Sequence, residues 1–209
     1  MPNIIFTLTI VFGLVLVNEI WWRSRKVHNE FNRKFVHITV GSFVATWPFF
    51  LTWHQIQLLS IAFLVVVGIS KYFNLFKAIH SVQRPTWGEI FFALAVGLVT
   101  LITKDQWIYT AAVLQMSLAD GVAAIVGVQF GNSNRYLVYK QAKSIAGTLA
   151  FFAASFAILV AYNHYGSSPV SFAQISFISI IASGLENLGV LGLDNLLVPL
   201  VVAFMLANH

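Results

Sequence analysis

The sequence contains no cysteine, which excludes disulfides and metal sites built on thiolate ligands. Charge is also scarce, because only 9% of the 209 residues are charged, against roughly 25% in a soluble domain. No stretch is long and polar enough for a separate soluble domain, and neither an internal repeat nor a low-complexity segment interrupts the chain. The composition therefore predicts one integral membrane domain over residues 1–209.

Hydrophobic residues make up 58% of the chain, and apolar runs of membrane-spanning length recur from end to end. We predict an all-α, polytopic transmembrane helical bundle of about eight spans. The first span is not a cleaved signal peptide, because no basic region precedes it and Trp21-Trp22 offers no small-residue cleavage site. The predicted spans are 3–22, 35–52, 56–73, 88–103, 107–130, 144–162, 170–185 and 196–207.

The positive charges indicate the orientation of these spans. If the spans alternate, 11 of the 12 lysines and arginines fall in loops on one side, and only Lys104 falls on the other. Such a bias is typical of cytoplasmic loops, so the N-terminus is predicted outside. The net charge of +5 then reports membrane topology, and no nucleic-acid partner is predicted. The basic residues assigned to the inner side are Arg23, Arg25, Lys26, Arg33, Lys34, Lys71, Lys77, Arg84, Arg135, Lys140 and Lys143.

Asp120 lies inside the apolar run of the fifth span, where a carboxylate is costly and usually functional. Small residues recur around it at helical spacing, so another helix or a ligand can approach the backbone closely on that face. A purely structural acid, paired with a lysine in the bundle, is the alternative. The residues of this face are Ser117, Asp120, Ala124, Gly127 and Gly131.

After this helix, residues 131–134 end the helical pattern and a basic loop leads to Lys143-Ser144, which opens the next apolar helix. A helix N-terminus attracts anions, because free N–H groups and the helix dipole both favour negative charge. The segment is not a Walker A motif, since Ala142 precedes the lysine, no strand is predicted and the glycine spacing differs. An acid on one helix and an anion site on the next suggest a metal–phosphate site.

The other polar residues of the predicted spans gather at the same inner face. Lys34 and His37, one helical turn apart, open the second span from the inside, and carboxylates approach from separate helices. Hard oxygen ligands of this kind suit Mg²⁺, which commonly bridges protein to substrate phosphates. The carboxylates concerned are Glu89, Asp120, Glu186 and Asp194.

Structural interpretations of single residues stay open beside the functional ones. Arg33 and Lys34 would serve as positive-inside anchors, His37 as a helix–helix hydrogen bonder and Glu89 as a first-turn acid. Gly127 and Gly131 would serve helix packing, and Asp194-Asn195 would be a plain N-cap. The polar stretch from residue 186 to 195 predicts either a tight re-entrant turn or a broken helix.

Five motifs, in order along residues 31–200, resemble those of the CTP-dependent lipid kinases: phytol kinase, dolichol kinase, the CTP-using diacylglycerol kinase and their bacterial relatives. They are Arg33-Lys34-x-x-His37-x-x-x-Gly41, Gly88-Glu89-x-x-Phe92, Ala119-Asp120-x-x-Ala123-x-x-x-Gly127-x-x-Phe130-Gly131, Lys143-Ser144-x-x-Gly147-Thr148, and Glu186 followed by Asp194-Asn195-Leu196-x-x-Pro199. Each motif is weak singly, but their common order makes the set specific.

The resemblance implies that the γ-phosphate of CTP is transferred to the hydroxyl of a membrane-embedded lipid alcohol at the cytoplasmic face. It implies a set of site residues in three roles. The catalytic residues would be Asp120, His37, Glu89 and Lys143; the residues binding CTP would be Arg33, Lys34, Gly127, Gly131, Lys143, Ser144, Gly147, Thr148 and Asn195; and the ligands of Mg²⁺ would be Asp120, Glu186 and Asp194.

Two other classes of protein stay open at this point. The segment from the acidic helix to the Lys143-Ser144 helix also resembles part of the phosphatidate cytidylyltransferases, which make a CDP-lipid and release pyrophosphate. The Glu186 and Asp194-Asn195 element favours the kinases. A secondary transporter would also gather acids and broken helices in a bundle, but nearer the midplane and often with internal repeats.

Overall fold

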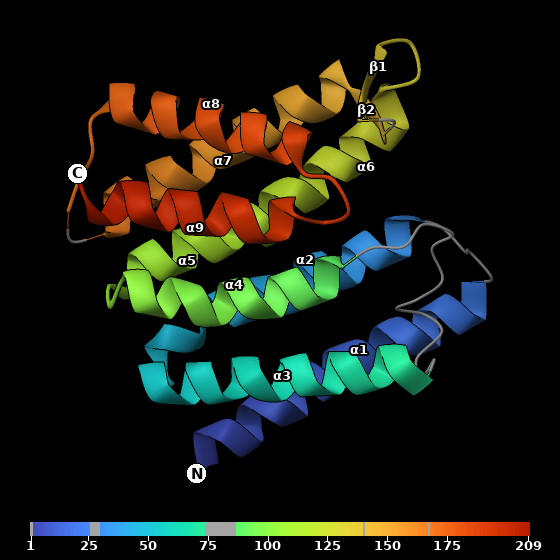
Figure 1. Ribbon diagram of the computed structural model, residues 1–209, viewed down its shortest axis with the longest axis vertical. Helices are drawn as coiled ribbons and strands as arrows, with labels where there is room; N and C mark the ends of the chain where they lie inside the picture. The colour runs from blue at the N-terminus through green and yellow to red at the C-terminus, as the bar shows by residue number, and fades with distance from the viewer. Residues whose placement is uncertain (1, 26–29, 74–86, 140, 167) are drawn as a thin grey trace.

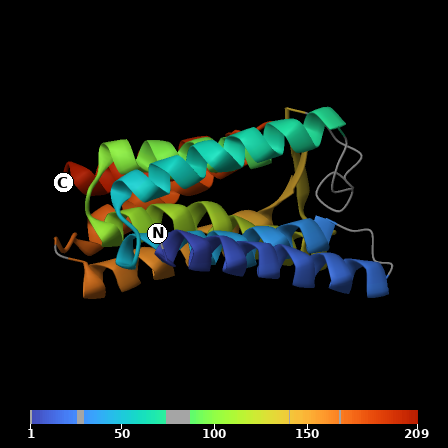
Figure 2. The same ribbon diagram turned by 90° about the horizontal axis from the view of Figure 1, so that it is seen from below.

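The computed structural model consists of helices that run side by side in roughly one direction, with a two-stranded hairpin at one end of the bundle (Figure 1). It describes residues 2–25, 30–73, 87–139, 141–166 and 168–209, without the side chains of residues 22–25, 30–33 and 70–73. At right angles, Figure 2 shows α1 and α2 side by side along one edge and α3 beside α4 along the other.

The elements follow the predicted order. They are α1 (Pro2–Arg25), α2 (Glu30–Ala45), the short 3₁₀ helix η1 (Trp47–Phe49), α3 (Trp53–Phe73), α4 (Gly88–Ile102), α5 (Gln106–Leu114), the π-helical turn η2 (Gln115–Ala119), α6 (Asp120–Phe130), β1 (Arg135–Val138), β2 (Gln141–Ser144), α7 (Ile145–Tyr165), α8 (Phe172–Leu188) and α9 (Asp194–Ala207). Each predicted span therefore contains a helix.

The continuous rod of α5, η2 and α6 lies at the centre of the bundle. It contacts α2 on one side and α7 and α9 on others, and Tyr109, Val113 and Met116 are fully buried along it. These large side chains fill the space between the rod and the neighbouring helices, so the helices pack tightly around it. The packing fixes the position of Asp120, which follows directly after η2.

Among the predicted helix ends, the end of the second span differs most from the structure. The second span was predicted to run to residue 52, but α2 ends at Ala45 and a 3₁₀ turn follows. Pro48 explains this, because it has no N–H for the helical ladder and disfavours helical geometry in the residue before it. The polar stretch before the last span forms a tight turn of residues 189–193 between two separate helices, α8 and α9.

The basic loop after α6 is a β-hairpin, so the prediction of no strand in this region was wrong. Residues of β1 and β2 pair antiparallel, with Arg135 opposite Ser144 and Tyr136 opposite Lys143. Tyr139, in the connecting turn, has a positive φ of 45°. Because β2 runs directly into α7, the pairing fixes the direction in which the chain enters that helix.

Three helical stretches of the described chain are long and apolar enough to cross a membrane: Pro2–Trp21, Gln106–Phe130 and Ile145–Tyr165. Four shorter apolar helices accompany them: Trp53–Ile69, Gly88–Ile102, Phe172–Leu188 and Asp194–Ala207. By length and composition these stretches indicate a membrane protein. The number of crossings and the orientation stay predictions. Of the basic residues assigned to the inner side, the side chains of Arg23, Arg25, Lys26, Arg33, Lys71, Lys77, Arg84 and Lys140 lie outside the described part.

The absence of native cysteine makes the orientation directly testable. The connection between α4 and α5, which contains Lys104, lies at the end of the bundle opposite to the hairpin (Figure 1). In the hairpin, Leu137 is 77% exposed. We expect a membrane-impermeant maleimide added outside intact cells to label Lys104→Cys, but to label Leu137→Cys only after permeabilisation. Labelling of residue 137 from the outside would overturn both the orientation and the cytoplasmic site.

Candidate active site

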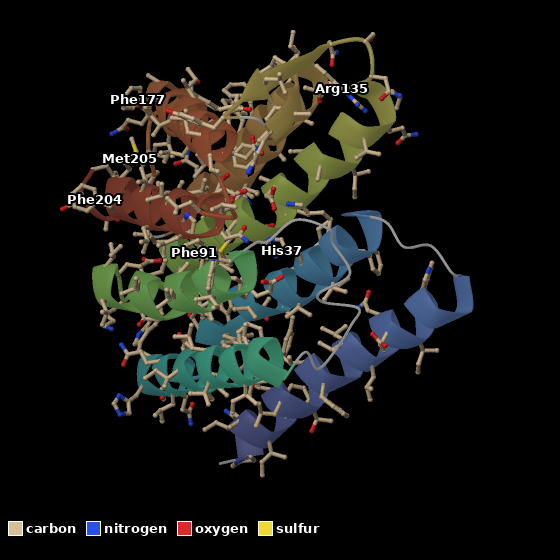
Figure 3. All side chains as sticks on the ribbon, turned by 45° about the vertical axis from the view of Figure 1, so that its right-hand side comes forward. His37, Phe91, Arg135, Phe177, Phe204 and Met205 are labelled. Carbon is tan, nitrogen blue, oxygen red and sulfur yellow. The ribbon has the colours of Figure 1, made fainter. Side chains whose placement is uncertain are left out.

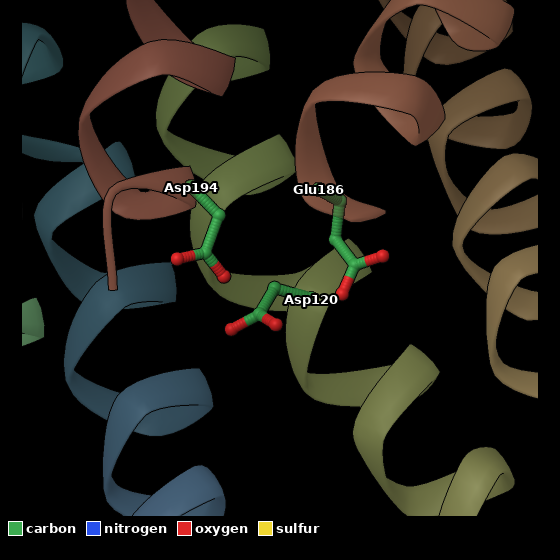
Figure 4. Close-up of side chains that lie close together, drawn as sticks. All are labelled: Asp120, Glu186 and Asp194. Carbon is green, nitrogen blue, oxygen red and sulfur yellow. The ribbon is translucent and has the colours of Figure 1, made fainter. Parts of the chain in front are cut away.

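Three carboxylates meet where α6, α8 and α9 come together. Asp120 begins α6, Glu186 lies near the end of α8, and Asp194 begins α9. One oxygen of each lies within 4.8 Å of the other two, and Figure 4 shows the three side chains converging. Asp120 and Glu186 are buried. The residues predicted as metal ligands are thus brought together from three helices, while metal binding itself stays a prediction.

Two lysines reach this carboxylate cluster from outside the three helices. Lys34 of α2 forms an ion pair with Asp120, and Lys143 of β2 forms one with Glu186. Lys143 Nζ also donates a hydrogen bond to the Glu186 carbonyl oxygen at 3.0 Å. The third acid differs, because the buried Oδ1 of Asp194 has no hydrogen-bond partner within the described part of the chain. Two of the three carboxylates are therefore neutralised by lysines.

The surroundings of Lys143 keep its ammonium group charged. Burial alone would lower its pKa, but the nearby carboxylates of Glu186, Asp194 and Asp120 outweigh burial and raise the pKa above the ordinary lysine value. Lys143 is therefore a cation throughout the neutral pH range.

A cavity of about 650 Å³ opens beside the carboxylates. Its polar side is formed by the cluster and its lysines, and its apolar side by Ala123, Ala124 and Val128 of α6. Most of the predicted site residues line it, although they lie far apart in the sequence. These are Lys34, Asp120, Gly127, Lys143, Ser144, Gly147, Thr148, Glu186, Asp194 and Asn195.

Three further predicted site residues, His37, Glu89 and Gly131, are not among the described residues that line the cavity. His37, labelled on α2 in Figure 3, has its Nε2 2.9 Å from the carbonyl oxygen of Met116 and 3.6 Å from Asp120 Oδ2. Glu89 lies in the first turn of α4, beside Gly88, whose carbonyl oxygen accepts a 3.1 Å hydrogen bond from Asn195 Nδ2. The side chain of Arg33 lies outside the described residues.

The start of α7 is occupied largely by its own chain. Ser144 is the N-cap, and its Oγ accepts a 3.1 Å hydrogen bond from the backbone N–H of Gly147. The N–H of Ile145 donates to the carbonyl oxygen of Asn134 at 3.1 Å. The sequence suggested free N–H donors at this helix start, but these two N–H groups are already bonded within the chain. Lys143, just before the cap, is held by Glu186, so it would reach an anion only when that acid takes another partner.

The predicted glycines allow close packing between α6 and α7. A Cβ at Gly127 would lie 3.6 Å from the Cα of Gly147 and 3.1 Å from Ser144 Oγ. A Cβ at Gly131 would overlap both the Gly127 carbonyl oxygen and the Ser144 side chain. Gly127 also lines the cavity, whereas Gly131 is not among its lining residues. Packing is thus a role of both glycines.

Irregular backbone precedes two acids of the cluster. The π-helical turn η2 adds a residue to the turn before Asp120, which rotates that side chain about the axis relative to a regular α-helix. Before Asp194, Leu191 has a φ of 58° and Gly192 a φ of 90°. A left-handed conformation is rare for a residue such as leucine and often marks a functional site. Both features change the direction in which the chain presents the acid that follows.

Several residues that line the cavity were not predicted from the sequence. Arg135 was noted only as part of a basic loop, yet it begins β1 and lines the cavity, as does Gln141 of β2. Its position directly after the polar residues 131–134 was a usable signal. Gly189, Leu191 and Gly192 of the α8–α9 turn also line the cavity, and none of them was predicted as a site residue.

A helical bundle of membrane type, with clustered acids and two lysines around a cavity at one end, is the architecture of a membrane enzyme that acts on a charged group. The relatives of the chain define that class more closely.

Curated relatives match most of the chain. Phytol kinase of Synechocystis sp. is 32% identical over 200 residues, covering 92% of this chain and 84% of its own length. Phytol kinase 1, chloroplastic, of Arabidopsis thaliana is 27% identical over 213 residues, covering 90% of this chain and 69% of its own. The chloroplastic farnesol kinase of Arabidopsis thaliana is 30% identical over 150 residues, covering 65% and 48%. No protein-family model and no solved structure matches the chain. The chain belongs to the phytol kinase family of lipid-alcohol kinases.

Proposed function

We propose that this protein transfers the γ-phosphate of CTP to the hydroxyl of an isoprenoid alcohol of the phytol or farnesol type, at the cytoplasmic face of a membrane. The observation that carries the proposal is the cluster of three carboxylates and two lysines at one cavity, in a chain of this family. Phosphoryl transfer needs positioning and charge neutralisation more than covalent chemistry, and such a cluster supplies both.

The carboxylate cluster fits a magnesium ion. Oxygen ligands bind Mg²⁺ at about 2.0–2.1 Å, so two oxygens on one ion lie at most about 4.2 Å apart. The oxygens of Asp120, Glu186 and Asp194 lie within 4.8 Å of one another. To share one ion they would draw closer together, because oxygens at neighbouring octahedral positions lie about 3 Å apart. The buried Asp194 Oδ1 without a hydrogen-bond partner is a further sign of a ligand. When bound, Mg²⁺ would neutralise charge on the nucleotide phosphates.

The lysines have a second role in this proposal. Lys34 and Lys143 now neutralise Asp120 and Glu186, and both line the cavity. When the acids hold a divalent cation, the two ammonium groups become available to phosphate oxygens. Arg135, on the same cavity, adds a guanidinium that suits phosphate geometry. We assign the phosphate contacts mainly to these side chains, because the N–H groups of Ile145 and Gly147 at the start of α7 are already used.

The alcohol would reach the site between α2 and α6. These helices touch closely at Ile38 and Gly121, where an added Cβ would overlap the isoleucine. Two turns further along α6, Val128 lines the cavity and is 64% exposed. An isoprenoid chain lying against this apolar side would bring its hydroxyl to Asp120 and the phosphates. His37, bonded at Nε2, suits orienting Asp120 better than accepting a proton there.

A double-label experiment tests the reaction. Purified protein in lipid that contains phosphatidate is given phytol, Mg²⁺ and CTP labelled at either the γ- or the α-phosphate. We expect γ-label in the lipid fraction and no α-label. A cytidylyltransferase would put the α-label into the lipid and release the γ-label as pyrophosphate, so that result would sink the kinase proposal. Transport of either label into vesicles without chemical change would favour a transporter.

A further inference from the structure

Tyr136 connects the hairpin to two helices through hydrogen bonds of its hydroxyl. The hydroxyl lies 2.5 Å from Thr148 Oγ1 and donates to Asn187 Oδ1 at 2.6 Å. Thr148 Oγ1 lies 3.1 Å from the same amide oxygen, and Asn187 Nδ2 donates to the Ser183 carbonyl oxygen at 3.1 Å. The three side chains form a closed triangle between β1, α7 and α8.

The triangle lies beside the ion pair at which Lys143 meets Glu186. Tyr136 is the cross-strand partner of Lys143, and Asn187 directly follows Glu186 in α8. Fixing Tyr136 to Asn187 therefore fixes the two backbones that carry the lysine and the acid. We infer that Tyr136 is a positioning residue, whose hydroxyl holds the hairpin on α8 so that Lys143 stays over the carboxylate cluster.

The hairpin needs such a connection because it is short. Two strands of four residues are marginally stable on their own and depend on packing against the rest of the protein. Leu137 and Tyr139 are 77% and 72% exposed, so they do not supply that packing, whereas Tyr136 points inward. Thr148 then acts through its hydroxyl as part of this connection, which differs from the direct nucleotide contact predicted for it.

The position of Lys143 can be measured without any substrate, by the rate at which an N-hydroxysuccinimide ester acetylates it. Tyr136→Phe removes only the hydroxyl, and Tyr139→Phe makes the same change at an exposed position of the same hairpin. We expect Lys143 to be acetylated about threefold to tenfold faster in Tyr136→Phe, the size expected for losing one neutral hydrogen bond. Tyr139→Phe should leave the rate unchanged. The rate at Lys104, at the other end of the bundle, reports any general unfolding.

Thr148→Ser keeps the hydroxyl and should preserve the slow rate, while Thr148→Val removes it and should raise the rate as Tyr136→Phe does. Equal Lys143 rates in Tyr136→Phe and Tyr139→Phe would overturn the inference. Its consequence for nucleotide rests on the proposed function: CTP with Mg²⁺, measured by calorimetry, should bind less tightly to Tyr136→Phe by a similar factor. Unchanged CTP affinity beside faster acetylation would refute the positioning role. If the unmodified protein binds no CTP, the proposed donor fails, and the acetylation rates still decide the role of Tyr136.

Discussion

Replacing Asp120 by Asn is expected to lower turnover by at least about 10²-fold, the scale of losing one preorganised charged group in an active site. The substitution keeps the volume of the side chain and removes the charge that would hold the metal. Binding of Mn²⁺ as a stand-in for Mg²⁺, followed by electron paramagnetic resonance without nucleotide, should weaken as well. Asp105→Asn makes the same change at the N-cap of α5, at the other end of the rod of α5, η2 and α6. It should leave turnover and Mn²⁺ binding unchanged.

The ion pair with Lys34 complicates the stability of this variant. Removing one partner of a buried pair strands the other charge, which costs about 3–5 kcal/mol in soluble proteins. We therefore expect Asp120→Asn to melt at a lower temperature, and Asp120→Asn with Lys34→Met to regain most of that loss. Turnover is therefore expressed per folded molecule. Near-normal turnover and Mn²⁺ binding in Asp120→Asn would leave only the structural alternative, an acid paired with a lysine.

The helices could be predicted because membrane proteins carry them as long apolar runs, which are visible without knowledge of tertiary contacts. The central rod from residue 107 to 130 was predicted as one span for this reason, and it is one continuous rod in the structure. The end of α2 was predicted less well, since the apolar residues around Pro48 continue the run after the helical hydrogen bonds have stopped.

The acids of the site could also be predicted, because carboxylates are rare in such a sequence and each one is conspicuous. Asp120 was conspicuous alone, and Glu186 and Asp194 because they flank a polar turn. Their convergence within 4.8 Å agrees with that interpretation. The partners of the acids were harder to predict. Lys34 has the position of an ordinary inside anchor, and only the packing of α2 against α6 brings it to Asp120.

The hairpin and the π-helical turn could not be predicted, because neither has a local signal. Strands of four residues with mixed polarity carry no clear alternation, and their pairing depends on the contact of Tyr136 with α7 and α8. A π-turn arises from packing around one helix rather than from its composition. In the turn before α9, Gly192 suggested a bend, but the left-handed conformation extends to Leu191 as well.

Lys143→Gln is expected to weaken CTP binding by about 10- to 10²-fold, the range for losing a hydrogen bond to a charged group. The variant keeps a polar side chain, one bond shorter, but removes the cation that lies on Glu186. Because the raised pKa keeps Lys143 protonated at neutral pH, the loss should be nearly constant between about pH 6 and pH 9. Lys104→Gln removes a lysine at the other end of the bundle and should leave CTP affinity unchanged.

The number of phosphates on the nucleotide separates a phosphate contact from a merely structural ion pair. If Lys143 binds phosphate, the loss caused by Lys143→Gln should be largest for CTP, smaller for CDP and nearly absent for CMP, because each phosphate removed takes away charge near the ammonium group. If Lys143 only neutralises Glu186, its removal disturbs the site in the same way whichever nucleotide is bound. An equal loss for all three nucleotides, measured by calorimetry with Mg²⁺ present, would therefore contradict the phosphate role of Lys143 and leave Lys34 and Arg135 as the remaining cations of the described cavity.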